Sequence, residues 1–257
     1  KLAKRHKFAQ LSGFVNGVLR NIARNIDSVQ FDTLSIRYSM PQWIVDRFVA
    51  AYGEKKAEEI FKAFHSKSTI SIRTNLTRCT PDELRVMLEA EGVTVTAVDE
   101  LDYAFVISGF DYLNGLQSFR DGLFYVQDIS SMLVAQTAAP KKGDYVIDVC
   151  AAPGGKSTHI AELLQGSGHV LARDLTDNKV DMIEENIDRH GLNNMSAEVW
   201  DATVFDADSA GKADILICDL PCSGLGVLGR KKDIRYKMTP ESVDELAALQ
   251  RQILDTV

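Results

Sequence analysis

The chain has 257 residues, of which 45% are hydrophobic and 25% charged, a composition that fits one large or two smaller globular domains. No apolar run is long enough to cross a membrane and no signal peptide begins at Lys1, so we expect neither a membrane protein nor an exported one. The net charge of −7 argues weakly against a nucleic-acid partner, whereas two local basic clusters argue for one.

The four cysteines, Cys79, Cys150, Cys218 and Cys222, lack the spacing of metal ligands, so we expect no metal site. Free thiols without an export signal are typical of a reducing compartment, which predicts a cytoplasmic protein. We also expect the protein to be a monomer.

Residues 1–66 form the first predicted segment, and their apolar spacing is helical. One stripe along residues 1–27 predicts an amphipathic helix that looks like the end of a larger helical unit. The stripe consists of Phe8, Leu11, Phe14, Val15, Val18, Leu19 and Ile22. Two further helices are predicted from Pro41 to about Gly53 and from Ala57 to Phe64.

Residues 67–123 form the second predicted segment, a small α/β module. Residues 68–76 alternate like a strand, and residues 93–98 and 104–107 read as two more. Between the first two strands, Thr80 is placed to cap a helix, with Pro81 at the first position and Glu83 completing a capping box. This helix is expected to end before Gly92.

Residues 124–257 form the third predicted segment, in which strands and helices alternate as in a parallel, doubly wound α/β domain. Strands are predicted at residues 145–150, 168–173, 195–200 and 213–219. Helices are predicted after Asp128, at 157–164 and 177–190, in part of 203–210 and towards the C-terminus. Four strands leave an uncovered hydrophobic edge, so we expect a domain incomplete at its C-terminus and a natural protein that extends past both ends of the chain.

The stretch Asp148-Val-Cys-Ala-Ala-Pro-Gly-Gly-Lys156 joins a predicted buried strand to a predicted helix. Adjacent glycines let a ligand approach the backbone closely, and the start of a helix offers free N–H groups. Asp174 follows Gly154 by 20 residues, at the end of the next predicted strand. An acid at that distance is placed to bind the two hydroxyls of a ribose, so the pattern predicts a site for a nucleoside cofactor.

Two other phosphate-binding patterns do not fit this loop. Gly155-Lys156-Ser157 ends like a P-loop, but Cys150 occupies the position of the required first glycine. The G-x-G-x-x-G pattern of dinucleotide sites is absent as well. A purely structural strand-to-helix turn is the remaining alternative.

The stretch Ile215-Leu-Ile-Cys-Asp-Leu-Pro-Cys-Ser-Gly224 is a predicted strand that ends at Asp219 and continues into a tight turn. In a doubly wound sheet the ends of neighbouring strands meet where ligands bind, so Asp219 and Cys222 should face the same crevice as the glycine loop. A thiol at such a site suggests covalent chemistry. The alternative is a buried structural cysteine, which strand alternation favours for Cys218.

Two basic clusters are candidates for binding a nucleic-acid backbone. The first consists of Lys1, Lys4, Arg5, Lys7, Arg20 and Arg24, with no acid before Asp27. The second consists of Arg230, Lys231, Lys232, Arg235 and Lys237, with Asp233 as its only acid. Arg230, Lys231 and Lys232 follow the Cys222 loop, where a target strand would pass, and are predicted to contact RNA. The alternative is that both clusters are solvated faces.

The two motifs resemble the first and fourth motifs of the Nol1/Nop2/Sun family, which are S-adenosylmethionine-dependent RNA cytosine-5 methyltransferases. Within that family the chain is most similar to the bacterial Sun/RsmB type, which methylates small-subunit ribosomal RNA. Residues 14–20 are similar to the last helix of a NusB-like RNA-binding domain, and residues 67–123 to the family's small α/β module. The resemblance implies a Rossmann-like methyltransferase domain over residues 124–257 and ribosomal RNA as the partner.

The resemblance also assigns the site. The methionine end of S-adenosylmethionine would lie against Cys150, Ala151, Ala152, Pro153, Gly154, Gly155 and Lys156. Asp174 would hold the ribose hydroxyls, and Asp201, after the third strand, would meet the adenine. Asp219 would lie between the cofactor methyl group and the target base.

The implied reaction needs a cysteine because carbon 5 of cytosine is a poor nucleophile. A thiolate that adds to carbon 6 creates an enamine-like intermediate, which takes the methyl group before a base removes the carbon-5 proton. In this family the nucleophile lies in a Thr-Cys motif, and the Pro-Cys cysteine, here Cys222, assists release. No Thr-Cys pair occurs in the 257 residues, so the nucleophile is expected beyond residue 257.

Several alternatives stay open. A DNA cytosine-5 methyltransferase would use the Pro-Cys cysteine itself as nucleophile, but its cofactor loop looks different. An amino-group methyltransferase would have an aromatic residue in place of Cys222. A methyltransferase of another RNA, such as tRNA, would share these motifs. A catalytically incomplete RNA-binding factor would share the fold, although the intact acids Asp174, Asp201 and Asp219 argue against it.

Overall fold

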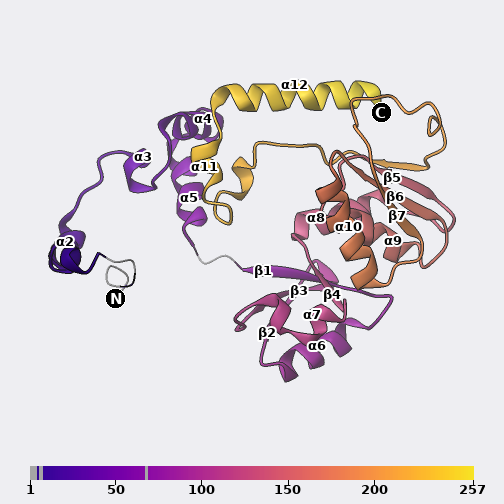
Figure 1. Cartoon of the computed structure of the whole chain (residues 1–257), viewed down its shortest axis with the longest axis horizontal. Coiled ribbons are helices and arrows are strands. Elements are labelled where there is room, and N and C mark those ends of the chain that lie inside the picture. The colour runs from indigo at the N-terminus through magenta and orange to yellow at the C-terminus, as the bar shows by residue number, and fades with distance from the viewer. Residues whose placement is uncertain (1–4, 6–7, 67–68) are drawn as a thin grey trace. The chain divides into compact units, whose positions relative to one another are not determined.

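The structure is a computed structural model that describes residue 5, residues 8–66 and residues 69–257 (Figure 1). The basic residues Lys1, Lys4 and Lys7, and the first residue of the strand predicted at 68–76, lie outside the described residues. The chain forms two compact units. One contains residues 1–66 and 226–237, and the other contains residues 67–225 and 238–257.

The first unit is helical. It contains η1 (Ala9–Leu11), α2 (Ser12–Asn25), η2 (Ile26–Ser28), α3 (Leu34–Arg37), α4 (Gln42–Tyr52), α5 (Glu54–Phe64) and α11 (Ile234–Lys237). The helices predicted after Pro41 and near Ala57 are confirmed as α4 and α5, which bury Ile44 and Phe61 between them. Most of the apolar stripe predicted for the first helix lies on α2, whereas Phe8 and Leu11 precede that helix. The stripe stays exposed, and Phe14 is 72% accessible.

The second unit begins with an antiparallel sheet of order β2-β3-β1-β4. Its strands are β1 (Ile70–Thr74), β2 (Thr94–Val98), β3 (Leu101–Ser108) and β4 (Phe124–Val126). Helices α6 (Pro81–Ala90) and α7 (Gln117–Arg120) accompany it, with η3 (Leu113–Gly115) between strands (Figure 1). The predicted capping box is present at α6, where Thr80 and Glu83 bond each other's backbone N–H groups.

The two faces of this small sheet differ in chemistry because side chains alternate along each strand. Ile72 and its cross-strand partner Phe105 face an apolar core that includes Leu84 of α6. Arg73 and its partner Ala104 lie on the opposite face. β4 pairs with β1 and so belongs to this sheet, although it lies just past residue 123, where the predicted module ended.

The second sheet is parallel, with the order β7-β6-β5-β8. Its strands are β5 (Tyr145–Asp148), β6 (His169–Asp174), β7 (Met195–Val199) and β8 (Ile215–Ile217). The connecting helices are α8 (Ile129–Ala138), α9 (Gly155–Leu163) and α10 (Asp177–His190), followed later by η4 (Leu225–Val227) and α12 (Pro240–Thr256). The doubly wound α/β fold expected from the sequence is therefore confirmed.

Different helices cover the two faces of the parallel sheet, as a strand buried on both sides requires. On one face, Val146 and Val170 pack against Ile160 of α9 and Ile183 of α10. On the other face, Ile147 packs in a cluster with Ile253 of α12. This arrangement brings the carboxyl ends of all four strands to one edge.

The helix predicted within residues 203–210 is wrong. Asp201 accepts hydrogen bonds from the backbone N–H of Thr203 at 2.9 Å and from its hydroxyl at 2.7 Å. Asp206 likewise accepts a bond from the N–H of Asp208 at 3.0 Å. These local side-chain bonds compete with the backbone bonds of a helix, so the segment forms turns.

Candidate functional site

The glycine loop lies between β5 and α9, at the carboxyl edge of the parallel sheet. Gly154 has φ = 100°, a left-handed conformation that side chains disfavour, and it is the N-cap of α9. A Cβ on Gly155 would lie 3.1 Å from the Tyr125 ring, so a larger residue would push that ring aside. Both glycines are therefore needed for this backbone, which presents the N-terminus of a helix to the edge of the sheet.

Asp174, at the end of β6, holds the loop in place. One of its carboxylate oxygens accepts a hydrogen bond from the N–H of Ala152 at 2.9 Å. The other accepts bonds from the N–H of Leu175 and the ammonium of Lys179, each at 2.8 Å. The carboxylate is 4% exposed, whereas the Lys179 side chain is 49% exposed and can be displaced by a ligand hydroxyl.

Asp148, the last residue of β5, lies buried beneath the same loop. It accepts a hydrogen bond from the Ser157 hydroxyl at 2.6 Å and a longer one from the N–H of Cys150 at 3.4 Å. Burial raises the pKa of this carboxyl from 3.8 to about 6, and the two hydrogen bonds oppose that rise. Asp148 thus ties the strand to the first turn of α9.

Asp219 follows β8 and meets the loop from the neighbouring strand. Its carboxylate forms an ion pair with Lys156, in the first turn of α9. Lys156 is largely buried and Asp219 more than half exposed, so the pair has one side open to a ligand.

The cysteines differ in what they can do. Burial, followed by the nearby Asp174 carboxylate, raises the pKa of Cys150 to about 11, so this thiol stays protonated at neutral pH. Burial also raises the pKa of Cys218, in line with the core position that its strand predicts. Cys222 is exposed, in the loop after Asp219. Of these three cysteines near the ends of β5 and β8, Cys222 is the one open to a substrate.

A pocket of about 160 Å³ joins these elements. It is lined by residues 125–128 and Ser131, by Asp148, by residues 151–153, and by Gly155, Lys156 and Asp219. The pocket therefore gathers most of the predicted loop with Asp219. Cys150, Gly154, Asp174, Asp201 and Cys222 do not line it.

Asp201 follows β7 and is exposed. The hydroxyl of Thr203 lowers the pKa of its carboxyl. The end of β7 lies beside the end of β6, because the N–H of Trp200 donates to the carbonyl of Asp174 at 2.9 Å. Asp174 and Asp201 thus lie at the ends of adjacent strands, and the side-chain hydrogen bonds described for Asp201 are to Thr203 and not to the glycine loop.

Only some residues of the second basic cluster are exposed to solvent. Arg230, Lys231 and Lys232 are exposed and belong to the helical unit, with residues 226–237. Arg235 is 4% exposed, and its guanidinium donates to the carbonyls of Ser39 at 3.0 Å and Tyr38 at 3.3 Å. Lys237 pairs with Asp233 at 2.7 Å. Arg235 therefore stabilises the unit and cannot belong to a binding surface.

Arg73 of β1 and Gln127, which follows β4, reach this site, although neither belongs to a recognised motif. Arg73 donates to the carbonyl of Gly155 at 2.9 Å and, at 2.5 Å, to the side-chain oxygen of Gln127, which lines the pocket. Both side chains are buried. The sequence pattern near Gln127 predicts only that Asp128 precedes a helix.

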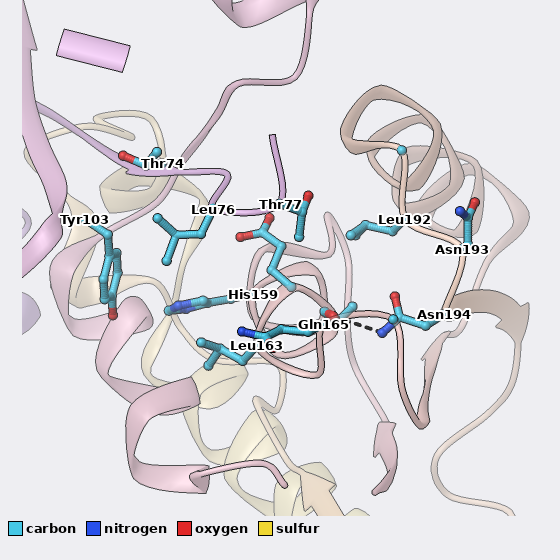
Figure 2. Close-up of a pocket in the computed structure, with 14 residues that line it drawn as sticks. Thr74, Leu76, Thr77, Tyr103, His159, Leu163, Gln165, Leu192, Asn193 and Asn194 are labelled. Carbon is cyan, nitrogen blue, oxygen red and sulfur yellow. Dashed lines mark hydrogen bonds between the residues drawn. The ribbon is translucent and has the colours of Figure 1, made fainter. Parts of the chain in front are cut away.

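A second pocket, of about 390 Å³, lies towards the other end of α9 (Figure 2). Figure 2 shows His159 pointing towards Tyr103 of β3, and the centres of the two rings are 5.4 Å apart. Burial lowers the pKa of His159 to about 2, so the imidazole is neutral. None of the predicted site residues lines this pocket, which lies where the small module meets the parallel sheet.

Two further observations concern membrane-spanning helices and metal sites. Within the described part of the chain, no helix has both the length and the apolar character needed to span a bilayer. No group of three or more metal-ligating side chains gathers among residue 5, residues 8–66 and residues 69–257.

Comparison with known proteins identifies the family. A family model described as 16S rRNA methyltransferase RsmB/F matches residues 135–257. A second, described as Methyltr_RsmF/B-like, ferredoxin-like domain, matches residues 40–110. The first covers the chain from within α8 onwards, and the second covers α4, α5 and the small module as far as β3.

Curated relatives match nearly the whole chain. The probable ribosomal RNA small subunit methyltransferase B of Bacillus subtilis is 37% identical over 262 residues, covering 99% of this chain and 58% of the relative. Ribosomal RNA small subunit methyltransferase B of Proteus mirabilis is 31% identical, covering 98% of this chain and 60% of the relative. The chain thus spans somewhat more than half the length of these relatives.

Solved structures show the same fold. The crystal structure of the protein PH0851 superposes with a TM-score of 0.83 at 25% identity, covering 99% of this chain and 58% of that one. NSun6 from Pyrococcus horikoshii, solved with SFG, has a TM-score of 0.72 at 20% identity, covering 84% of this chain and 79% of that one. With the loop geometry and both family models in agreement, the chain belongs to the RsmB/F family of methyltransferases.

Proposed function

We propose that this chain is part of an S-adenosylmethionine-dependent enzyme that methylates cytosine carbon 5 in small-subunit ribosomal RNA through a covalent cysteine–cytosine intermediate. The observation that carries the proposal is the pocket in which the glycine loop, Lys156 and Asp219 come together. The names of the curated relatives support ribosomal RNA as the substrate.

The residues of the loop suit S-adenosylmethionine, which supplies an electrophilic methyl group on a sulfonium. The two glycines let the backbone approach a ligand closely at the start of α9. Asp174, one strand over, keeps an acceptor site for ribose hydroxyls once the exposed Lys179 ammonium moves away. In this proposal residues 150–156 bind the methionine end, Asp201 lies near the adenine and Asp219 lies between methyl group and base.

In this proposal, the residues that act on the target base are Asp219 and Cys222, which follow β8. Asp219 is a carboxylate held by Lys156, so it can accept a proton or hydrogen bond from a cytosine without drifting. Cys222 is exposed three residues later and can reach a bound base, whereas the half-buried Cys150 thiol has a raised pKa and is protonated at neutral pH. We assign Cys222 to the release step, in which it helps remove the carbon-5 proton.

The test is a Cys222→Ala variant of the longer protein that contains this chain, mixed with small-subunit ribosomal RNA and S-adenosylmethionine. A release residue has a distinct signature: its removal traps the covalent RNA–protein adduct, seen as a denaturant-resistant shifted band. The matched control is Cys79→Ala, a buried thiol of the small module, which should leave no adduct and retain 5-methylcytosine formation. If Cys222→Ala gives no adduct and no methylation, Cys222 is itself the nucleophile and the assignment is wrong.

We further propose that the protein is a cytoplasmic monomer that binds RNA through Arg230, Lys231 and Lys232. Four free cysteines are consistent with a reducing compartment. Sedimentation of the longer protein at micromolar concentration should give the mass of one chain, and a dimer mass would contradict the monomer.

A methyltransferase acting on another RNA, such as tRNA, and a catalytically incomplete RNA-binding factor are the competing functions. Calorimetry with S-adenosylmethionine separates the second, because a vestigial fold has no reason to keep affinity for the cofactor. Bisulfite sequencing of total RNA from cells with and without the protein separates the first.

A further inference from the structure

Gln127 is one of the described residues that line the pocket of about 160 Å³, and only one end of its side-chain amide is hydrogen-bonded. Its side chain is 6% exposed, and its oxygen accepts a bond from Arg73 at 2.5 Å. Its nitrogen is buried and has no hydrogen-bond partner among the described residues. A buried amide donor left unpaired is costly, so such a group in a pocket points to a ligand.

The orientation of this amide follows from its neighbours. The backbone of Gln127 is fixed to β1, since its N–H donates to the carbonyl of Ser71 at 3.1 Å and its carbonyl accepts from the Ser71 hydroxyl at 2.7 Å. A guanidinium can only donate, so the amide oxygen must face Arg73. The amide nitrogen is therefore turned away from Arg73, and it belongs to a residue that lines the pocket.

Arg73 is itself held rigidly enough to set this orientation. It is fully buried and donates to the carbonyl of Gly155, to the hydroxyl of Thr158 and, at 2.8 Å, to the carboxylate of Glu162. Its guanidinium lies over the ring of Tyr125, with the guanidinium carbon 5.4 Å from the ring centre. A single side chain from the small module thus links the glycine loop to the Gln127 amide.

The charge and size of the pocket restrict what the amide can meet. Three carboxylates line it, those of Asp128, Asp148 and Asp219, against the single cation Lys156. These acceptor oxygens suit a neutral base that carries an amino group. At about 160 Å³ the pocket is smaller than the roughly 300–1,000 Å³ of sites for drug-sized ligands, so it suits one ring.

We propose that Gln127 reads the target cytosine: its side-chain nitrogen donates to the acceptor edge of the base, at oxygen 2 or nitrogen 3, while Asp219 accepts from the amino group on carbon 4. Arg73 is the positioning residue that presents the amide. This inference rests on the proposed function, because it takes the ligand of the pocket to be the base that is methylated.

The diagnostic variant is Gln127→Glu in the longer protein. The new carboxylate still accepts from Arg73 but offers no donor, so the fold stays intact and only the hydrogen bond to the base is removed. We expect kcat/KM for small-subunit ribosomal RNA to fall by about tenfold or more, with an unchanged Kd for S-adenosylmethionine and an unchanged Tm. Gln127→Met, which has neither donor nor acceptor, should show the same reduction of kcat/KM.

The effect of pH follows from the same contact. The Arg73 guanidinium keeps the new carboxylate of Gln127→Glu ionised and unable to donate, so its deficit in kcat/KM should match that of Gln127→Met at each pH from about 5.5 to 8. The matched control is Gln252→Glu, the same change on the exposed face of α12, which should leave kcat/KM and its pH profile unaltered.

The outcomes are distinguishable. If the natural protein forms no 5-methylcytosine, the proposed function is wrong, and the inference about Gln127 is wrong as well. If the natural protein is active and both Gln127 variants keep their kcat/KM, Gln127 does not read the base. If the variants lose cofactor affinity instead, the amide serves the cofactor, and the assignment to cytosine is overturned.

Discussion

At the scale of single residues, the site depends on two carboxylates that differ in surroundings. Asp148 is 1% exposed and has a pKa raised to about 6 by burial, whereas Asp219 is open to solvent and paired with a lysine. A carboxyl whose pKa is higher in the folded than in the unfolded protein binds a proton more tightly when folded. Charging Asp148 therefore costs stability.

This gives a pH prediction with a definite sign. The stability of the natural protein should include a contribution that is present below about pH 4 and is lost as the pH rises through about 6, worth up to roughly 3 kcal/mol. Asp148→Asn should remove that slope, because its amide cannot ionise and Ser157 can turn its hydroxyl to accept. Urea unfolding between pH 4 and 8 measures both; identical slopes would contradict the burial effect.

Asp174 carries a second prediction. Replacing it with alanine removes the acceptor of the Ala152 and Leu175 N–H groups and the site assigned to the ribose. Each hydrogen bond to a charged group is worth about 1.5–3 kcal/mol, so the Kd for S-adenosylmethionine should rise at least tenfold by calorimetry. Asp181→Ala, on the exposed side of α10, is the control. Unchanged affinity in Asp174→Ala would refute the cofactor assignment.

The sequence was informative about residues whose partners lie in recognisable patterns. The pattern predicts that Asp174 lies at the same site as the glycine loop and binds a ribose. The structure joins Ala152 to Asp174 directly, and the ribose role stays a prediction. Arg73 and Gln127 were missed because their partners are remote in the chain: the bonds of Arg73 to Gln127 and Gly155 span 54 and 82 residues. A local pattern cannot report a contact that exists only after two sheets have packed.

At the scale of elements, the same distinction separates correct from incorrect predictions. Elements with strong local signals, such as the capping box of α6 and the apolar strands β5 and β6, formed as predicted. Residues 203–210 have helix-compatible spacing, but Asp201 and Asp206 bond to their own backbone and form turns. β4 was assigned to no sheet in advance, because pairing with β1 across some 50 residues leaves no trace in either segment.

The capping box of α6 gives a prediction about an element. Thr80→Ala removes the hydroxyl that accepts from the N–H of Glu83 and should destabilise the protein by about 1 kcal/mol in urea unfolding. Thr137→Ala is the control, since that hydroxyl only bonds back to Leu133 within α8. Equal effects of the two substitutions would mean that the cap adds nothing.

The segment after the Cys222 loop gives a prediction about RNA. Reversing the charges of Arg230, Lys231 and Lys232 should weaken RNA binding and reduce the slope of log K against log salt by about 0.7 for each single-strand phosphate that is no longer neutralised. Lys55, Lys56 and Lys62 on α5 allow the same change of charge elsewhere in the helical unit. A salt slope that does not move in the first variant would make the segment a solvated face.

At the scale of the whole molecule, the buried ion pair of Arg73 and Glu162 joins the antiparallel sheet to the parallel one. Both side chains are at most 3% exposed, and Glu162 also lies 3.4 Å from the neutral His190. The two sheets are accordingly parts of one compact unit. Elements separated in sequence by some 90 residues here depend on each other for their charge balance.

This dependence can be measured. Arg73→Met should destabilise the protein by about 3–5 kcal/mol, because it leaves the Glu162 carboxylate buried without its cation. Adding Glu162→Met should restore much of that stability, since removing both charges removes the desolvation cost as well. A double-mutant cycle by urea unfolding tests the coupling, and additive effects would show that the pair does not interact.

The pairing of Arg73 with Glu162 and with the Gly155 carbonyl also limits how this protein can be recombined. A chimera could take residues 67–126 from one homologue and the parallel sheet from another. It would keep these contacts only if the first homologue has the arginine and the second has both the glutamate and the glycine turn. Exchange of the small module alone would bury a lone charge next to the cofactor loop. The two parts are therefore expected to be inherited as one piece, despite having the outlines of two separate domains.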